Sequence, residues 1–254
     1  MRAYFAFTKK ELIENLRTYR VFILAIVFLL FGFMNPAFAK FMPDILKSAA
    51  PSGIKINIPP PTALDSWGQF FKNVGQMGFL VLVIVFCGIM ANEFNRSTLI
   101  NMLTKGLKRS TVIFSKFTVA VAIWTLSYLL CFIVTYFYTD YYWKMDGMHH
   151  VFLTFFSLWL FGILLIALLI LGGVWFKNIY GSLLLTGGNV VTMMLLNINP
   201  KLHKYNPITL SSENMSLLNA QKEVSDFIPA IIICAIFIIA LVASSVAIFN
   251  KKQV

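Results

Sequence analysis

The sequence predicts an all-α, polytopic membrane protein with six transmembrane helices, an N-terminal interfacial helix and both termini in the cytoplasm. Of its 254 residues, 59% are hydrophobic and only 12% are charged, whereas about 25% of the residues of a typical soluble domain are charged. The hydrophobic residues are gathered into long uncharged segments, and the basic residues lie mainly on one side of them. We therefore expect residues 1–254 to form a single transmembrane domain.

Six uncharged segments are each long enough to cross a bilayer, because about 20 helical residues span a hydrocarbon core of roughly 30 Å. The segments are Val21–Ala39, Asn73–Asn92, Phe117–Thr139, Val151–Phe176, Asn178–Pro200 and Phe227–Asn250. Within these bounds none contains Asp, Glu, Lys, Arg or His. Proton and ion relays depend on ionisable groups inside the membrane. The sequence therefore weighs against an ion-coupled carrier.

The distribution of charge predicts the orientation of the helices. If the N-terminus is inside, the cytoplasmic pieces are 1–20, 93–116, Lys177 and 251–254. These pieces hold 13 of the 21 basic residues and three of the ten acids. Cytoplasmic loops carry an excess of Lys and Arg, so both termini are expected inside. The net charge of +11 then reflects membrane orientation, and we expect a lipid bilayer, and no nucleic acid, as a partner.

The N-terminal residues 1–20 predict a helix in the inner membrane interface. Thr8 and Glu11 have the spacing of a capping box, in which each side chain binds the backbone of the other residue. Apolar residues follow at helical spacing, with basic residues around them. The apolar stripe consists of Leu12, Ile13, Leu16 and Tyr19.

No residue pattern in the chain points to catalysis. A membrane serine protease needs a serine nucleophile and a histidine on another span; Ser182 follows Gly181, but all three histidines lie outside the predicted spans. The phosphate-binding pattern GxxxxGK[ST] is absent, so ATP would have to be bound by a different chain. The three cysteines form no CxxC pattern. We expect no catalytic residue, metal site or cofactor in this chain.

The segment 93–116 joins the second and third spans and carries five basic residues and one acid. Ser97 or Thr98 can begin a helix, and Gly106 can end it. Four apolar residues between them recur at helical spacing: Leu99, Ile100, Met102 and Leu103. A helix of about eight residues is unstable alone, so it needs a docking partner or a membrane surface.

Six spans, an interfacial helix and this loop together resemble the ABC-2 type transporter permeases. The loop residues that carry the resemblance are Glu93, Thr98, Leu99, Leu103, Arg109 and Lys116. Ser97 stands where the family commonly has glycine, and Gly106 lies near its usual proline. The resemblance implies that this loop forms a coupling helix, with Met102 on its apolar patch. That helix would dock on a separate cytoplasmic ATP-binding cassette subunit, which would hold ATP and Mg.

The resemblance also implies a second permease half, identical or different, and a substrate pathway lined by spans two and five. We select as candidate pathway residues Gln76, Thr186, Asn189 and Asn197. Packing between helices explains such small and polar side chains equally well. Residues 200–226 are expected to form an extracellular loop with a short helix.

The substrate expected from an uncharged pathway is an amphipathic peptide, a hydrophobic antibiotic or a lipid. The chain is similar to small Gram-positive permeases of this family that expel cytolytic or antimicrobial peptides, phenol-soluble modulins among them. This similarity implies export by alternating access in the cell membrane. Two alternatives stay open: a lipid or glycolipid exporter permease, and a membrane sensor or bacteriocin-immunity protein that binds a peptide without transporting it.

Overall fold

The computed structural model describes residues 2–49, 59–95, 104, 106–144, 148 and 150–252. All regular secondary structure in these residues is helical. Six stretches are long and apolar enough to cross a membrane: Arg20–Leu46, Ala63–Phe94, Arg109–Tyr142, Val151–Phe176, Ile179–Leu196 and Val224–Lys251. The chain is therefore an all-α, multi-pass membrane protein, as the sequence predicted.

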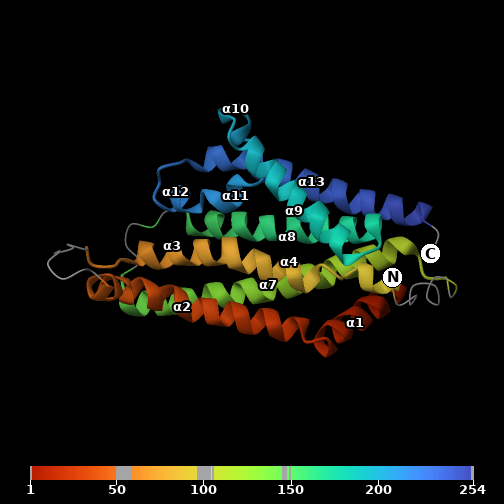
Figure 1. Ribbon diagram of the computed structural model, residues 1–254, viewed down its shortest axis with the longest axis horizontal. Coiled ribbons are helices and arrows are strands. Elements are labelled where there is room, and N and C mark those ends of the chain that lie inside the picture. Colours follow the sequence, from red (N-terminus) through yellow and green to blue (C-terminus); the bar gives the residue numbers. More distant parts are fainter. Residues whose placement is uncertain are drawn as a thin grey trace.

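Helix α8 (Val151–Phe176) lies at the centre of the bundle (Figure 1). It packs against α9 (Ile179–Leu196) and α13 (Val224–Lys251) on one side and against α7 (Arg109–Tyr142) and the second span on the other. Helix α2 (Arg20–Ala49) packs outside α7. Burial agrees with this arrangement. Of an apolar 18-residue stretch in each helix, 83% is buried in the central α8 but only 17% in the peripheral α9.

Both chain termini lie at the same end of the bundle (Figure 1). We call this the inner end, since its excess of Lys and Arg predicts that it faces the cytoplasm. The opposite, outer end holds three short helices between α9 and α13. They are α10 (Pro200–His203), α11 (Thr209–Ser212) and α12 (Asn214–Leu218). Buried Leu210, Leu217 and Leu218 hold α11 and α12 against the bundle, whereas α10 has no buried residue.

The second span is irregular and longer than predicted. It consists of α3 (Ala63–Asn73), the π-helical turn η1 (Val74–Gly78), α4 (Phe79–Phe86) and, after a turn, α5 (Ala91–Asn95). The predicted start at Asn73 is wrong, because the charge of Lys72 was taken as the end of the span. The helix instead begins at a cap in which the backbone N–H and hydroxyl of Thr62 both donate to Asp65 at 2.8 Å.

Other helix ends also extend beyond the predicted spans. Helix α2 continues to Ala49 instead of ending at Ala39. Helix α7 begins at Arg109, so residues 109–116 are helical and not part of the connecting loop. In these added turns Lys40 lies over the ring of Tyr142, and Arg109 and Lys116 bind groups on other helices. A hydrophobicity pattern does not show such partners.

Helix α1 (Arg2–Arg17) begins six residues before the predicted cap at Thr8. The capping box is therefore wrong: Thr8 donates to the hydroxyl of Ser115 at 3.1 Å, and Glu11 binds Lys116. Phe7, Glu11 and Asn15 form the buried face, whereas the apolar stripe of Leu12, Ile13 and Leu16 is exposed. This inverted pattern is typical of a helix that turns apolar residues toward lipid.

Polar side chains join the first three spans nearer the outer end. The Asn73 amide donates to the side-chain oxygen of Asn35 at 2.7 Å, and the Asn35 amide donates to the hydroxyl of Thr135 at 3.3 Å. The hydroxyls of Ser66 and Thr139 lie 2.6 Å apart. Such bonds hold membrane helices together because no water competes for them.

Candidate functional site

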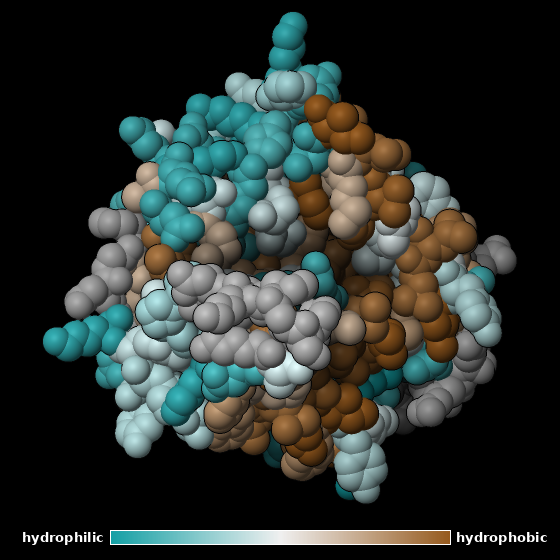
Figure 2. Space-filling model, turned by 60° about the vertical axis from the view of Figure 1, so that its left-hand side comes forward, coloured by the Kyte–Doolittle hydropathy of each residue, from teal (hydrophilic) through white to brown (hydrophobic). Residues whose placement is uncertain are grey.

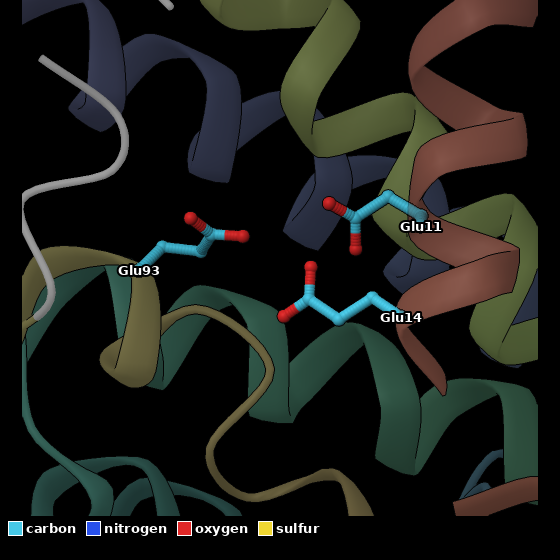
Figure 3. Close-up of side chains that lie close together, drawn as sticks. All are labelled: Glu11, Glu14 and Glu93. Carbon is cyan, nitrogen blue, oxygen red and sulfur yellow. The ribbon is translucent and has the colours of Figure 1, made fainter. Parts of the chain in front are cut away.

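Five charged side chains meet at the inner end between α1, α5 and α7. We call Lys10, Glu11, Glu14, Glu93 and Lys116 the ionic cluster. The Lys116 ammonium lies 2.8 Å from Glu11 and 2.9 Å from Glu93. The Lys10 ammonium lies 3.0 Å from Glu11, 2.6 Å from Glu14 and 3.1 Å from Glu93. Figure 3 shows the three carboxylates converging from α1 and α5.

The centre of the ionic cluster is removed from water. The side chains of Lys116 and Glu11 are each 2% exposed, and that of Glu93 is 5% exposed. A buried ion costs several kcal/mol unless it is paired. Burial alone would lower the pKa of Lys10, but its hydrogen bond to Glu14 and the charges of Glu11 and Glu93 outweigh burial and raise that pKa well above its ordinary value.

The three carboxylates lie close enough together to suggest a metal site, within 4.8 Å of one another. The two ammonium groups already bind all three, however, because each carboxylate forms at least one ion pair with Lys10 or Lys116. The arrangement is therefore an ion-pair network that fixes helices. It joins α1 to the end of the second span and to the start of the third.

The ionic cluster includes both ends of the segment predicted to be a coupling loop. Glu93, in α5, is the first residue of that segment, and Lys116, in α7, is its last. Gly106 has a φ of 86°, a left-handed conformation that favours glycine. The predicted docking residues Thr98, Leu99, Met102 and Leu103 lie outside the described residues.

Arg109 binds the chain's own C-terminal end. Its guanidinium lies 5.3 Å from the ring centroid of Phe249 and donates to the carbonyls of Phe249, Asn250 (3.2 Å) and Lys252. The last carbonyls of a helix lack partners within the helix and carry partial negative charge. Arg109 thus caps α13, a contact that its place in the loop motif did not predict.

Lys252 fixes the same end of the bundle from the other direction. Its ammonium donates to the carbonyl of Val174 at 2.8 Å and to that of Trp175, at the end of α8. Burial and the nearby charge of Lys177 lower the pKa of Lys252. The inner ends of α7, α8 and α13 are consequently held together by two cations.

The four candidate pathway residues do not share one surface. Gln76 and Thr186 line the same cavity of about 450 Å³ between the second span and α9. Asn189 lines a separate cavity of about 290 Å³ that faces α13, and its amide donates to the carbonyl of Leu185 at 2.9 Å. Asn197 accepts a 3.4 Å hydrogen bond from Asn206 at the outer end of α9. Of the four, only Gln76 and Thr186 therefore line one cavity.

Within the ionic cluster, Glu93 was predicted from the sequence as a site residue, whereas Lys10, Glu11 and Glu14 were not. A signal was present: the buried Glu11 and Asn15 are four residues apart, on the face opposite the apolar stripe. On a helix whose apolar residues meet lipid, the polar face must meet protein or water. That signal shows a polar contact but does not identify Lys116 as the partner.

Comparisons with known proteins agree with the membrane assignment. No family model matches the chain. It is 21% identical over 140 residues to the uncharacterized transmembrane protein YxlG of Bacillus subtilis (strain 168). The match covers 54% of this chain and 54% of that protein, so the chain spans about half the length of the relative. This similarity supports a transmembrane protein and says nothing of its cargo.

Proposed function

We propose that this chain is the permease subunit of an ATP-driven exporter of the ABC-2 type. In this proposal the chain itself is not an enzyme. A separate cytoplasmic ATP-binding cassette subunit holds ATP and Mg, and a second permease half completes the transporter. The observation that carries the proposal is the ionic cluster, which ties both ends of segment 93–116 to α1 through Lys116, Glu93 and Glu11.

The ionic cluster gives a displaced loop a way to move the membrane helices. A partner that shifts segment 93–116 pulls on α5 and α7 together, because Glu93 and Lys116 are bonded to each other. Helix α7 continues as the third span, and α5 ends the second span, whose α4 portion lines the 450 Å³ cavity. ATP can drive such a change only if it binds the two conformations with different affinity.

The exposure of α9 supports a second permease half. Only 17% of the apolar stretch of α9 is buried, the lowest value among the six spans of the described residues. Large side chains such as Leu184 and Leu195 are 73% and 63% exposed. In a membrane this face meets lipid or another protein. A second permease half facing α9 would close the cavity between α9 and the second span into an enclosed pathway.

The cargo class that we propose is an amphipathic or hydrophobic compound, with peptides first. Apolar side chains such as Phe79, Leu165 and Val190 dominate the 450 Å³ cavity. Small-molecule sites commonly measure about 300–1,000 Å³ and are mostly apolar with few polar groups. A peptide would place one or two side chains there at a time.

Affinity purification of the tagged chain in mild detergent, followed by mass spectrometry, tests the proposal. A stoichiometric ATP-binding subunit is expected, and the number of permease types in the complex shows whether the two halves are identical. Reproducible absence of such a subunit, with the chain intact, would overturn the proposal. It would favour a peptide-binding sensor or immunity protein.

A further inference from the structure

Three adjoining cavities form one continuous furrow along the second span. Their volumes are about 340, 390 and 450 Å³, from the outer end toward the membrane interior. The first two share the lining residues Gly68, Lys72 and Met215. The second and third share Gly75, Gln76, Met194, Ile208 and Ser211. We call this continuous space the outer furrow.

One wall of the outer furrow is a polar stripe on the second span. Gln69, Lys72 and Gln76 recur at spacings of three and four residues, which places them on one helix face. Gly68 and Gly75 line the same wall, so no side chain there screens the polar groups. Figure 2, in which the outer end comes forward, shows a hollow near the middle of the surface with hydrophobic residues gathered to its right.

Lys72 gives the outer furrow a fixed positive charge. Its side chain is exposed to the furrow, and no carboxylate of the described residues forms an ion pair with it. Asp65, which lines the same cavity as Lys72, accepts hydrogen bonds from Thr62 as the helix cap. Asp65 keeps its negative charge and disfavours an anion in the first cavity. On the side of the second cavity, however, Lys72 is the charged residue of the lining, so its ammonium is available there to an anion from outside the chain.

The inner part of the outer furrow is apolar. Beyond Gln76 its lining includes Leu80 and Val83 from α4 and Leu165 and Val190 from α8 and α9. Residues 72 and 83 are separated by roughly 16 Å along the helix axis, at 1.5 Å per residue. The outer furrow therefore has a cation at Lys72, where its first two cavities meet, and an apolar part that runs inward from Gln76. This is the order in which a single-chain amphiphile presents its headgroup and tail.

We propose that the outer furrow binds an anionic amphiphile, with a phosphate or carboxylate at Lys72 and one alkyl chain along Leu80 and Val83 toward Val190. Charge complementarity at Lys72 selects the anionic headgroup. The apolar walls select the alkyl chain of the ligand. This site goes beyond the proposed function and does not rest on it, because the chain alone, without any ATP-binding subunit, carries every residue used.

The test is native mass spectrometry of the purified full chain in the uncharged detergent dodecyl maltoside, titrated with dodecyl phosphate. One bound dodecyl phosphate per chain is expected, with affinity at least tenfold above that of dodecanol, because only the phosphate forms a charge-assisted hydrogen bond with the Lys72 ammonium. Titration with inorganic phosphate distinguishes a site for an amphiphile, which binds phosphate weakly, from a site that binds any phosphate anion. Phosphate binding as tight as that of dodecyl phosphate would overturn the assignment of the apolar part.

Two variants separate the two ends of the site. Lys72→Gln is expected to weaken dodecyl phosphate at least tenfold and to leave dodecanol unchanged, while Lys72→Arg keeps the affinity. Gly187→Leu fills the apolar part and is expected to weaken both ligands. Gly187 lines the 450 Å³ cavity and a Cβ there meets no atom within 4 Å, so the added side chain starts in open space. An unchanged Tm of Gly187→Leu in detergent checks that the fold is kept.

The matched control is Lys40→Gln. Lys40 lies toward the outer end of α2 with its ammonium 3.7 Å from the ring centroid of Tyr142, and it does not line the outer furrow. Unchanged binding is expected. Equal losses of dodecyl phosphate affinity in Lys40→Gln and Lys72→Gln would show that only the general surface charge matters, and would overturn the site. Full affinity in Lys72→Gln would overturn it as well.

Discussion

The Lys116 ammonium lies 2.9 Å from a carboxylate oxygen of Glu93, and these two residues bracket the longest connection at the inner end. The same ammonium also binds Glu11 of α1 at 2.8 Å. Three separate parts of the chain thus depend on one buried cation. Its removal should affect the loop, the interfacial helix and the third span together.

Lys116→Met should destabilise the protein strongly. The change leaves Glu11 and Glu93 buried with only Lys10 to balance them, and breaking a buried pair in this way costs about 3–5 kcal/mol. A marked fall in Tm in detergent is expected, measured by thermal unfolding. Lys9→Met is the control, because Lys9 is an exposed lysine of α1 beside the ionic cluster and forms no ion pair with another described residue. Equal Tm values for the two variants would contradict the role of the ionic cluster.

Lys10 makes the stability of the ionic cluster dependent on pH only in strongly alkaline solution. Its pKa is raised in the folded protein, so its stabilising effect is complete below the unfolded value of about 10.4. The effect is lost as pH rises through the higher folded pKa. The Tm difference between the wild type and Lys10→Gln should be constant from pH 6 to 9 and shrink above about pH 10.4. A difference that disappears between pH 6 and 8 would contradict this assignment.

The sequence predicted the number of spans and the whole of α8 because both depend on local hydrophobicity. The predicted starts of α3 and α7 are wrong because the charged residues Lys72 and Lys116 lie inside helices. The predicted start of α1 is wrong because Thr8 and Glu11 bind residues of α7 and form no capping box. Whether Lys116 can lie inside a helix depends on Glu11, 105 residues away. No local pattern contains that pairing. Similarly, the polar residues Gln76 and Asn189 were treated alike, but neighbouring helices place them in different cavities.

Arg109→Ala should loosen the C-terminal end of α13. The variant loses the donor to the carbonyls of Phe249, Asn250 and Lys252, and hydrogen bonds to charged groups contribute about 1.5–3 kcal/mol. Faster hydrogen exchange over residues 245–252 is expected, with the rest of α13 unchanged. Lys108→Ala, at the exposed neighbouring position, should exchange like the wild type. If the two variants exchange alike, Arg109 is not the cap of α13.

Leu103→Asp tests the predicted docking helix, and it is a prediction from the sequence alone. A charge in the apolar patch should abolish association with an ATP-binding subunit, because a desolvated docking surface does not accept an unpaired carboxylate. Membrane insertion should be unaffected, since Leu103 lies outside the six uncharged segments of the sequence. A pull-down from membranes measures both. Normal recovery of the ATP-binding subunit would remove this patch from the interface.

Gly187→Trp tests whether the cavity between the second span and α9 is part of a transport pathway. Gly187 lines this cavity, and a Cβ there meets no atom within 4 Å, so an indole ring can occupy the space without displacing the helices. Export of the proposed peptide cargo should fall at least tenfold, while recovery of the ATP-binding subunit in a pull-down stays at the wild-type level.

Gly188→Trp is the matched control for this variant. Gly188 is the next residue in α9 and is equally free of neighbours within 4 Å, but it does not line the cavity. Since consecutive residues of a helix point about 100° apart, the same ring at Gly188 is directed away from the cavity. Gly188 shares its helix face with Leu184, where a second permease half would sit, so recovery of both permease halves in the pull-down is checked for each variant. With both halves recovered, normal export by Gly188→Trp and blocked export by Gly187→Trp would place the cargo between the second span and α9. Unchanged export by both would exclude this cavity from the pathway while leaving the outer furrow as a binding site.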